Sequence, residues 1–115
     1  MFELKNKIAL VTGARRGMGK SHALALAAQG AKVAVTDIDQ NECQLVVDEI
    51  KEKGGEAAAF KMNVVDSSEV DKVFSEVVKK YGRLDILVNN DGIYAPKMAL
   101  ELTEEDWDKM ININL

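Results

Sequence analysis

The sequence predicts an α/β fold in which a parallel sheet carries helices on both faces. Short apolar segments alternate with longer amphipathic segments along the chain, and no two-residue hairpin turn joins two apolar runs. Strands that alternate with helices favour parallel pairing, because each helix crosses back over the sheet before the next strand. The 115 residues, 47% of them hydrophobic, are enough for one domain with its own core, which we place over residues 1–115.

The first strand is predicted over Lys7–Thr12, and it leads into a glycine-rich loop over residues 13–19. A helix of small residues follows at Ser21–Ala28. A strand that turns through glycines into a helix presents free backbone N–H groups and the positive end of the helix dipole. This arrangement predicts a site for an anion such as a pyrophosphate.

The second strand is predicted over Ala31–Thr36, directly before Asp37. The helix after it begins at Asp39, because Glu42 lies three residues later in a pattern typical of a capping box. Its core-facing residues follow the helical spacing i, i+3, i+4, i+7 and are Cys43, Val46, Val47 and Ile50.

The remaining elements follow the same alternation. A third strand is predicted over Ala57–Met62, and Asp66 caps a helix that Gly82 closes. The fourth strand is Leu84–Val88. Residues 93–102 are predicted to be a loop, and a last helix is predicted from Thr103 to the end of the sequence.

Composition disfavours several classes of function. The net charge of −4 disfavours nucleic acid as a partner, since no basic stripe is present to neutralise phosphates. One cysteine, Cys43, permits no disulfide within the chain, and one histidine, His22, makes a metal site unexpected. The sequence contains neither an apolar run of the ~20 residues that span a membrane nor a signal-peptide pattern, so we expect a cytoplasmic protein without membrane contact.

Two chemistries compete for the glycine loop. Residues 14–21 are close to a phosphate-binding loop of ATPases, in which Lys20 would reach the terminal phosphates and Ser21 a magnesium ion. The alternative is a dinucleotide loop, which requires an acidic residue about 20 residues further on to hold the adenosine ribose. Asp37 stands at that place, and the spacing therefore favours a dinucleotide.

Several motifs together resemble the short-chain dehydrogenase/reductase family. They are the loop Thr12–Gly19, Asp37 after the second strand, Asn63-Val64 after the third, Asn89–Gly92 after the fourth, and Ile113–Leu115. The resemblance covers the whole chain. It implies a Rossmann-like sheet with strand order 3-2-1-4, as one half of a doubly wound fold, and a parent enzyme that moves hydride between NAD(P) and an alcohol or carbonyl.

The resemblance also implies roles for individual residues. The cofactor-binding residues it implies are Gly13, Arg16, Gly17, Met18, Gly19, Asp37, Ile38, Asn63, Val64, Asn90 and Gly92. The glycines shape the pyrophosphate turn and Met18 offers its backbone N–H. Asn63 would contact the adenine amino group, and Ile38 would pack near the adenine. Asn114 matches the family's active-site asparagine, which takes part in a proton relay.

The choice between NAD and NADP depends on charge near the ribose. Arg16 could clamp the 2′-phosphate of NADP, but the Asp37 carboxylate would repel that phosphate, so NAD is favoured. Arg15 is interpreted as a solvated loop side chain. Asn63 and Asp91 depart from the family pattern, which has aspartate and alanine there, and a carboxylate at residue 91 predicts weakened NAD affinity.

The family's tyrosine with a lysine four residues later has no match in the chain. Tyr81 is followed four residues on by Asp85, and Tyr94 by Met98. We therefore expect an N-terminal fragment that binds NAD without catalysis, and a fourth strand left as an exposed edge. That edge, or the last helix, predicts a homodimer. Two alternatives remain open: a half that becomes active with a complementing chain, and a self-associating structural unit without ligand.

Overall fold

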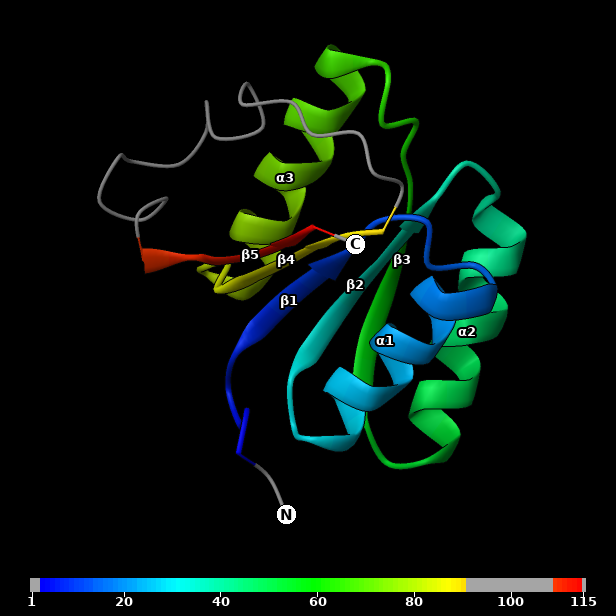
Figure 1. Cartoon of the computed structure of the whole chain (residues 1–115), viewed down its shortest axis with the longest axis vertical. Helices are drawn as coiled ribbons and strands as arrows, with labels where there is room; N and C mark the ends of the chain where they lie inside the picture. Colours follow the sequence, from blue (N-terminus) through cyan, green and yellow to red (C-terminus); the bar gives the residue numbers. More distant parts are fainter. Residues whose placement is uncertain (1–2, 91–108, 115) are drawn as a thin grey trace.

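The computed structural model describes residues 3–90 and 109–114, and it contains a five-stranded parallel sheet in the order β3-β2-β1-β4-β5 (Figure 1). The elements are, in chain order, β1 Ile8–Val11, α1 Gly17–Ala28, β2 Lys32–Asp37, α2 Gln40–Glu52, β3 Glu56–Lys61, α3 Ser67–Tyr81, β4 Ile86–Asn89 and β5 Ile111–Asn114. The predicted α/β class and the predicted 3-2-1-4 strand order are confirmed.

Helices cover both faces of the sheet. One face packs against α1 and α2 and contributes Ala9 and Val11 of β1 to a buried cluster with Val47 and Ile50. The opposite face packs against α3, where Ile8 and Leu10 lie in a second cluster. Alternate residues of one strand therefore enter different cores, as the period of two along a strand requires.

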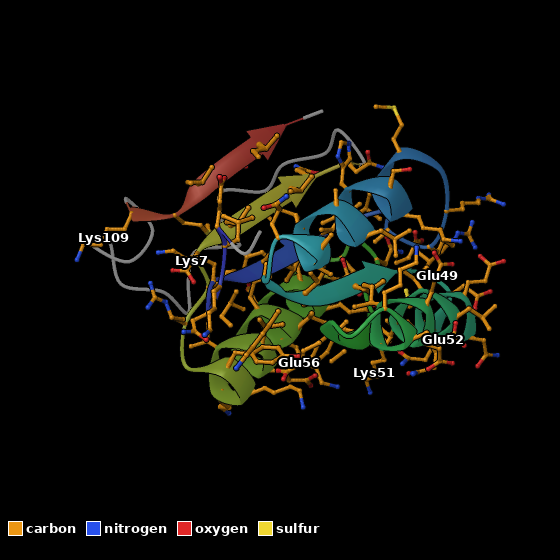
Figure 2. The ribbon with its side chains drawn as sticks, turned by 90° about the horizontal axis from the view of Figure 1, so that it is seen from below. Lys7, Glu49, Lys51, Glu52, Glu56 and Lys109 are labelled. Carbon is orange, nitrogen blue, oxygen red and sulfur yellow. The ribbon has the colours of Figure 1, made fainter. Side chains whose placement is uncertain are left out.

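Local capping signals fix the ends of two helices. The Asp39 carboxylate accepts the N–H of Glu42 at 3.0 Å at the start of α2. The Asp66 carboxylate accepts the N–H groups of Ser68 and Glu69 at 3.1 and 3.2 Å. Gly82 ends α3 in the left-handed conformation with φ 85°. Figure 2 shows that charged side chains such as Glu49, Lys51 and Glu52 extend outward from α2.

The end of the chain differs from the prediction. The predicted last helix is wrong over Ile111–Asn114, which forms β5 parallel to β4 with Ile86 opposite Ile111. Isoleucine alternates with asparagine there, and β-branched residues at a period of two favour a strand. Because β4 pairs with both β1 and β5, the predicted exposed edge at the fourth strand is also wrong. The other predictions for residues 91–108 lie outside the described residues.

Candidate functional site

The glycine loop leaves the carboxyl end of β1 and enters α1, beside the ends of β2 and β4. Gly13 and Gly17 have positive φ angles of 60° and 63°, which glycine adopts without the strain that a side chain would cause. No side chain caps α1 and its first turn carries no acidic residue, so the positive end of the helix dipole is not neutralised locally. The predicted helix start at Ser21 is wrong, since α1 begins at Gly17 and includes the last two loop glycines.

Gly19 allows α1 to pack directly on the loop. A Cβ atom at this residue would lie on the carbonyl oxygen of Gly13, 2.7 Å from the carbonyl carbon and 2.9 Å from Nδ2 of Asn90. Those contacts are shorter than real Cβ contacts, and two of the three involve backbone. The absence of a side chain at Gly19 therefore allows the close approach of the helix to the loop.

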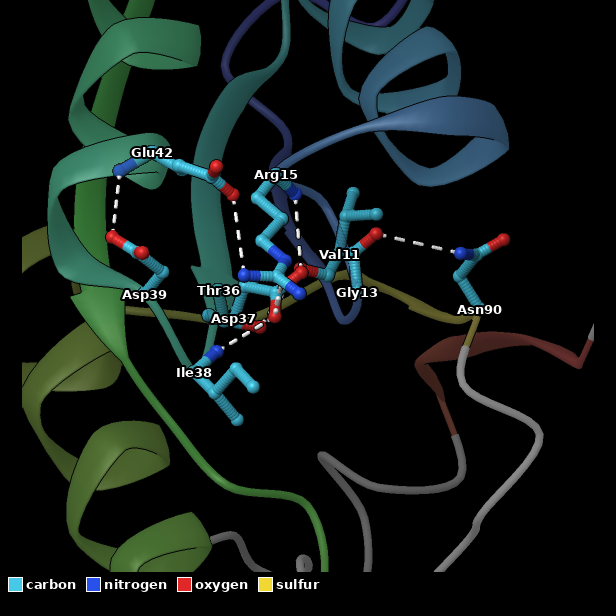
Figure 3. A network of polar contacts seen from close by, with 9 residues as sticks. All are labelled: Val11, Gly13, Arg15, Thr36, Asp37, Ile38, Asp39, Glu42 and Asn90. Carbon is cyan, nitrogen blue, oxygen red and sulfur yellow. Dashed lines mark hydrogen bonds and ion pairs between the residues drawn. The ribbon is translucent and has the colours of Figure 1, made fainter.

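The loop is attached to β2 through Asp37. The backbone N–H of Arg15 donates to Asp37 Oδ2 at 3.2 Å, and the N–H of Ile38 donates to Oδ1 at 2.7 Å (Figure 3). The Ala14 N–H also donates to the carbonyl of Thr36 at 3.0 Å. Two backbone donors thus hold the Asp37 carboxylate beside the loop, and lone pairs on its oxygens remain for further donors.

The Arg15 side chain lies against two carboxylates instead of extending into solvent. Its Nε atom lies 3.5 Å from Asp37 Oδ1, and its guanidinium lies 3.2 Å from Glu42 Oε2 on α2. Only 21% of its side chain is exposed. The interpretation of Arg15 as a solvated side chain is therefore wrong, whereas Arg16 is exposed.

Cys43 lies beside the same charges at the start of α2. Burial raises the pKa of its thiol to about 12, the carboxylates of Asp37, Asp39 and Glu42 add to the rise, and Arg15 opposes it. The thiol is fully buried and stays protonated at neutral pH. This supports its predicted role as a small core residue rather than a nucleophile.

The end of β4 is held against the loop by a hydroxyl. The Thr12 hydroxyl donates to Asn89 Oδ1 at 3.3 Å and accepts the backbone N–H of Asn90 at 3.0 Å. The side-chain amide of Asn90 then donates to the carbonyl of Gly13 at 3.4 Å. Asn90 therefore lies against the loop, while Asn89 is buried.

Asn63 and Val64 follow the end of β3. The side-chain oxygen of Asn63, predicted to contact adenine, accepts the N–H of Val65 at 3.1 Å. That turn uses one lone pair of the oxygen, and the predicted adenine contact would use the second. The side chains of Ile38 and Met18, near the loop, are 53% and 66% exposed.

The side chain of Lys20 is directed to α2. Its ammonium lies 3.2 Å from Glu49 Oε1, and this contact is the main cause of the lowered pKa of that carboxyl. In the ATPase interpretation, Lys20 would instead turn back over the loop to reach phosphates. The observed pairing favours the dinucleotide interpretation.

Asn114 lies at the same edge of the sheet as the glycine loop, whereas Tyr81 does not. Tyr81 is the last residue of α3, where burial and, to a smaller extent, the negative charge of Glu56 at the start of β3 raise the pKa of its phenol. It therefore lies at the opposite edge of the sheet from the loop. Asn114 pairs in register with Asn89 through β5, and Gly92, Asp91 and Tyr94 lie outside the described residues.

Two features are absent from the described part of the chain. No group of three or more acidic, histidine or cysteine residues that could hold a metal occurs in residues 3–90 and 109–114. Within the same residues, no helix has the length and apolar character needed to cross a bilayer.

A parallel sheet whose first strand feeds a glycine loop, with an acidic residue at the end of the second strand, defines the dinucleotide-binding class of α/β folds. Residues 7–115 match the family model described as short chain dehydrogenase, and the chain belongs to this family.

Curated relatives are 3-oxoacyl-acyl-carrier-protein reductases. The protein from Thermotoga maritima is 40% identical over 99% of this chain and 46% of its own length. The protein from Staphylococcus aureus strain Mu50 is 46% identical over 95% of this chain and 45% of its own. The chain thus spans a little under half of these relatives.

Solved structures share the fold. A hydroxysteroid dehydrogenase from Escherichia coli superposes with a TM-score of 0.76 at 39% identity, over 77% of this chain and 38% of the other. A short chain dehydrogenase from Mycobacterium smegmatis gives a TM-score of 0.76 at 32% identity, over 96% of this chain and 47% of the other.

Proposed function

We propose that this chain holds NAD(H) as the cofactor-binding part of a short-chain dehydrogenase that moves hydride between the nicotinamide and an alcohol or carbonyl. The observation that carries the proposal is the Asp37 carboxylate, oriented by the N–H groups of Arg15 and Ile38 beside the glycine loop. A ribose diol donates two hydrogen bonds, and a fixed carboxylate with lone pairs left to use is a suitable acceptor.

The pyrophosphate would lie over the loop at the start of α1. Backbone N–H groups of the first helical turn, including that of Met18, would donate to its oxygens, and the helix dipole favours the negative charge. The adenine would lie between the exposed side chain of Ile38 and the turn that contains Asn63 and Val64, and Asn90 would bound the cofactor on the side of β4.

The charge at the ribose supports NAD over NADP. Asp37, Asp39 and Glu42 bring three carboxylates to the start of α2, against one guanidinium from Arg15. A 2′-phosphate carries up to two further negative charges, and like charges at short distance repel. We propose that this balance gives a preference for the unphosphorylated ribose.

Catalysis requires an acid that the described residues do not bring to this edge of the sheet. Tyr81, the tyrosine within residues 3–90, lies at the opposite edge. We propose that the chain binds the cofactor without turning over substrate alone, and that a complementing chain with the serine, tyrosine and lysine would restore hydride transfer. Asn114 would then serve the proton relay.

The reductase and dehydrogenase names of the relatives support a carbonyl or alcohol substrate. The lone Cys43 supports a cytoplasmic location.

Calorimetric titration of the chain with NADH, NADPH and magnesium–ATP tests the proposal. NADH should bind most tightly, and Asp37→Asn should weaken it at least about tenfold, since hydrogen bonds to a charged group contribute about 1.5–3 kcal/mol. Binding of magnesium–ATP that NADH does not displace would establish the ATPase interpretation instead. No heat with any of the three nucleotides would leave the self-associating structural unit as the function.

A further inference from the structure

The Arg15 guanidinium lies between two carboxylates that belong to different elements. Asp37 ends β2 and Glu42 lies in the first turn of α2, and both contact Arg15 within 3.5 Å (Figure 3). No role for the Arg15 side chain follows from the sequence. Its position, however, is within reach of any group attached to the 2′-oxygen of a ribose that is bound to Asp37.

We infer that Glu42 is a specificity-determining residue, which excludes the 2′-phosphate of NADP by holding Arg15 against α2. The inference rests on the proposed function, because it needs the ribose on Asp37. A hydroxyl bound to the Asp37 carboxylate sits within about 3 Å of it, and Arg15 Nε lies 3.5 Å from Oδ1. Arginine is otherwise well suited to a phosphate, which it binds through two parallel hydrogen bonds.

The contact with Glu42 restrains the position of the Arg15 guanidinium. Glu42 Oε2 is buried and makes no hydrogen bond, so its contact with the guanidinium at 3.2 Å is an ion pair of imperfect geometry. Asp37 has additional partners by comparison, because two backbone N–H groups also donate to it. Loss of the Glu42 charge would therefore free the guanidinium without disturbing the carboxylate that holds the ribose.

The negative charge of Glu42 also competes with a 2′-phosphate for the Arg15 guanidinium. With Glu42 ionised, one guanidinium faces Asp37 and Glu42 together, and a 2′-phosphate would compete with both for it. With a neutral residue there, Arg15 would have one carboxylate partner and could turn to the phosphate. One unit charge at about 8 Å from a phosphate charge changes the interaction free energy by about 1.4 kcal/mol at a dielectric constant of about 30. We therefore expect a gain of about tenfold in NADPH affinity.

Four versions of the full chain test this inference by titration with NADH and NADPH: the unaltered chain, Glu42→Gln, Arg15→Gln with Glu42→Gln, and Glu52→Gln. Glu52 is exposed at the far end of α2 and supplies the matched loss of one charge from the same helix (Figure 2). Thermal unfolding followed by circular dichroism checks that each version folds. The N–H of Glu42, not its carboxylate, receives the helix cap from Asp39, so Glu42→Gln keeps that bond.

The expected result is a ratio of the NADPH to the NADH dissociation constant that falls about tenfold in Glu42→Gln, through tighter NADPH binding. The ratio should return toward the original in the double variant and stay unchanged in Glu52→Gln. An unchanged ratio in Glu42→Gln, an equal fall in Glu52→Gln, or a fall that persists without Arg15 would overturn the inference alone. Failure of the unaltered chain to bind either dinucleotide would overturn the proposed function and this inference with it.

Discussion

Replacing Gly19 by alanine separates the packing role of this residue from its helix propensity. Alanine is favoured over glycine inside a helix by about 1 kcal/mol, so propensity alone predicts a more stable protein. The added Cβ, however, would lie on the carbonyl oxygen of Gly13 and 2.9 Å from Nδ2 of Asn90. Overpacking of this kind costs about 1–3 kcal/mol and occasionally more. Because the obstacle is backbone, we expect a cost of about 4 kcal/mol, which leaves a net loss of about 3 kcal/mol after the gain in helix propensity.

Gly17→Ala is the matched control. Its Cβ would meet nothing within 4 Å, so only the positive φ of 63° opposes the change. A left-handed conformation costs an L-residue about 1–2 kcal/mol, and we expect a loss of that size.

Urea unfolding measures both variants. With a slope of about 2 kcal/mol per molar urea, Gly19→Ala should lower the midpoint by about 1.5 M and Gly17→Ala by about half as much. Gly19→Ala should also weaken NADH binding, because α1 must move away from the loop. A Gly19→Ala midpoint equal to or above that of the unaltered chain would refute the packing argument.

Three further predictions concern the rest of the chain. Burial raises the Cys43 pKa from 9.0 to about 12, so the unfolded chain releases this proton first. The stability it contributes is present below pH 9 and is lost as pH rises toward 12, and urea unfolding at rising alkaline pH should show a smaller loss in Cys43→Ala. The family resemblance implies a turn against the cofactor at residue 91, so Asp91→Ala should tighten NADH binding in calorimetry, and an equal affinity would contradict this. We predict that β5, the terminal strand of the described sheet, pairs two copies of the chain, since its Ile111 is 59% exposed. Ile111→Lys should then lower the sedimenting mass, and an unchanged mass distribution would exclude that edge as the interface.

Features encoded by neighbouring residues could be predicted from the sequence. The caps at Asp39 and Asp66, the stop at Gly82 and the loop glycines all act within a few residues of themselves, and the structure has them as expected. The strand order also followed from the family resemblance. These elements place the loop and Asp37 at one edge of the sheet.

Features that depend on distant residues could not be predicted in this way. The position of Arg15 is set by Glu42, which lies 27 residues later and becomes its neighbour only when α2 packs beside the loop. The strand at Ile111–Asn114 has four residues, a length at which pairing with β4 decides between helix and strand. The turn between Asn63 and Val65 could have been recognised from the residue type, since asparagine side chains often accept a backbone N–H two residues on.

Mapping NADH binding onto the backbone amides by NMR tests most directly whether the glycine loop and Asp37 hold the dinucleotide. We expect saturable shifts for residues 13–19 and for Ile38, with smaller effects at Asn90. A hollow of about 590 Å³ along β3 and α3, lined in part by Lys61, Glu69 and Lys72, provides an alternative location. Shifts confined to that hollow, or loop amides that stay unmoved at saturating NADH, would contradict the claim that the glycine loop and Asp37 hold the dinucleotide.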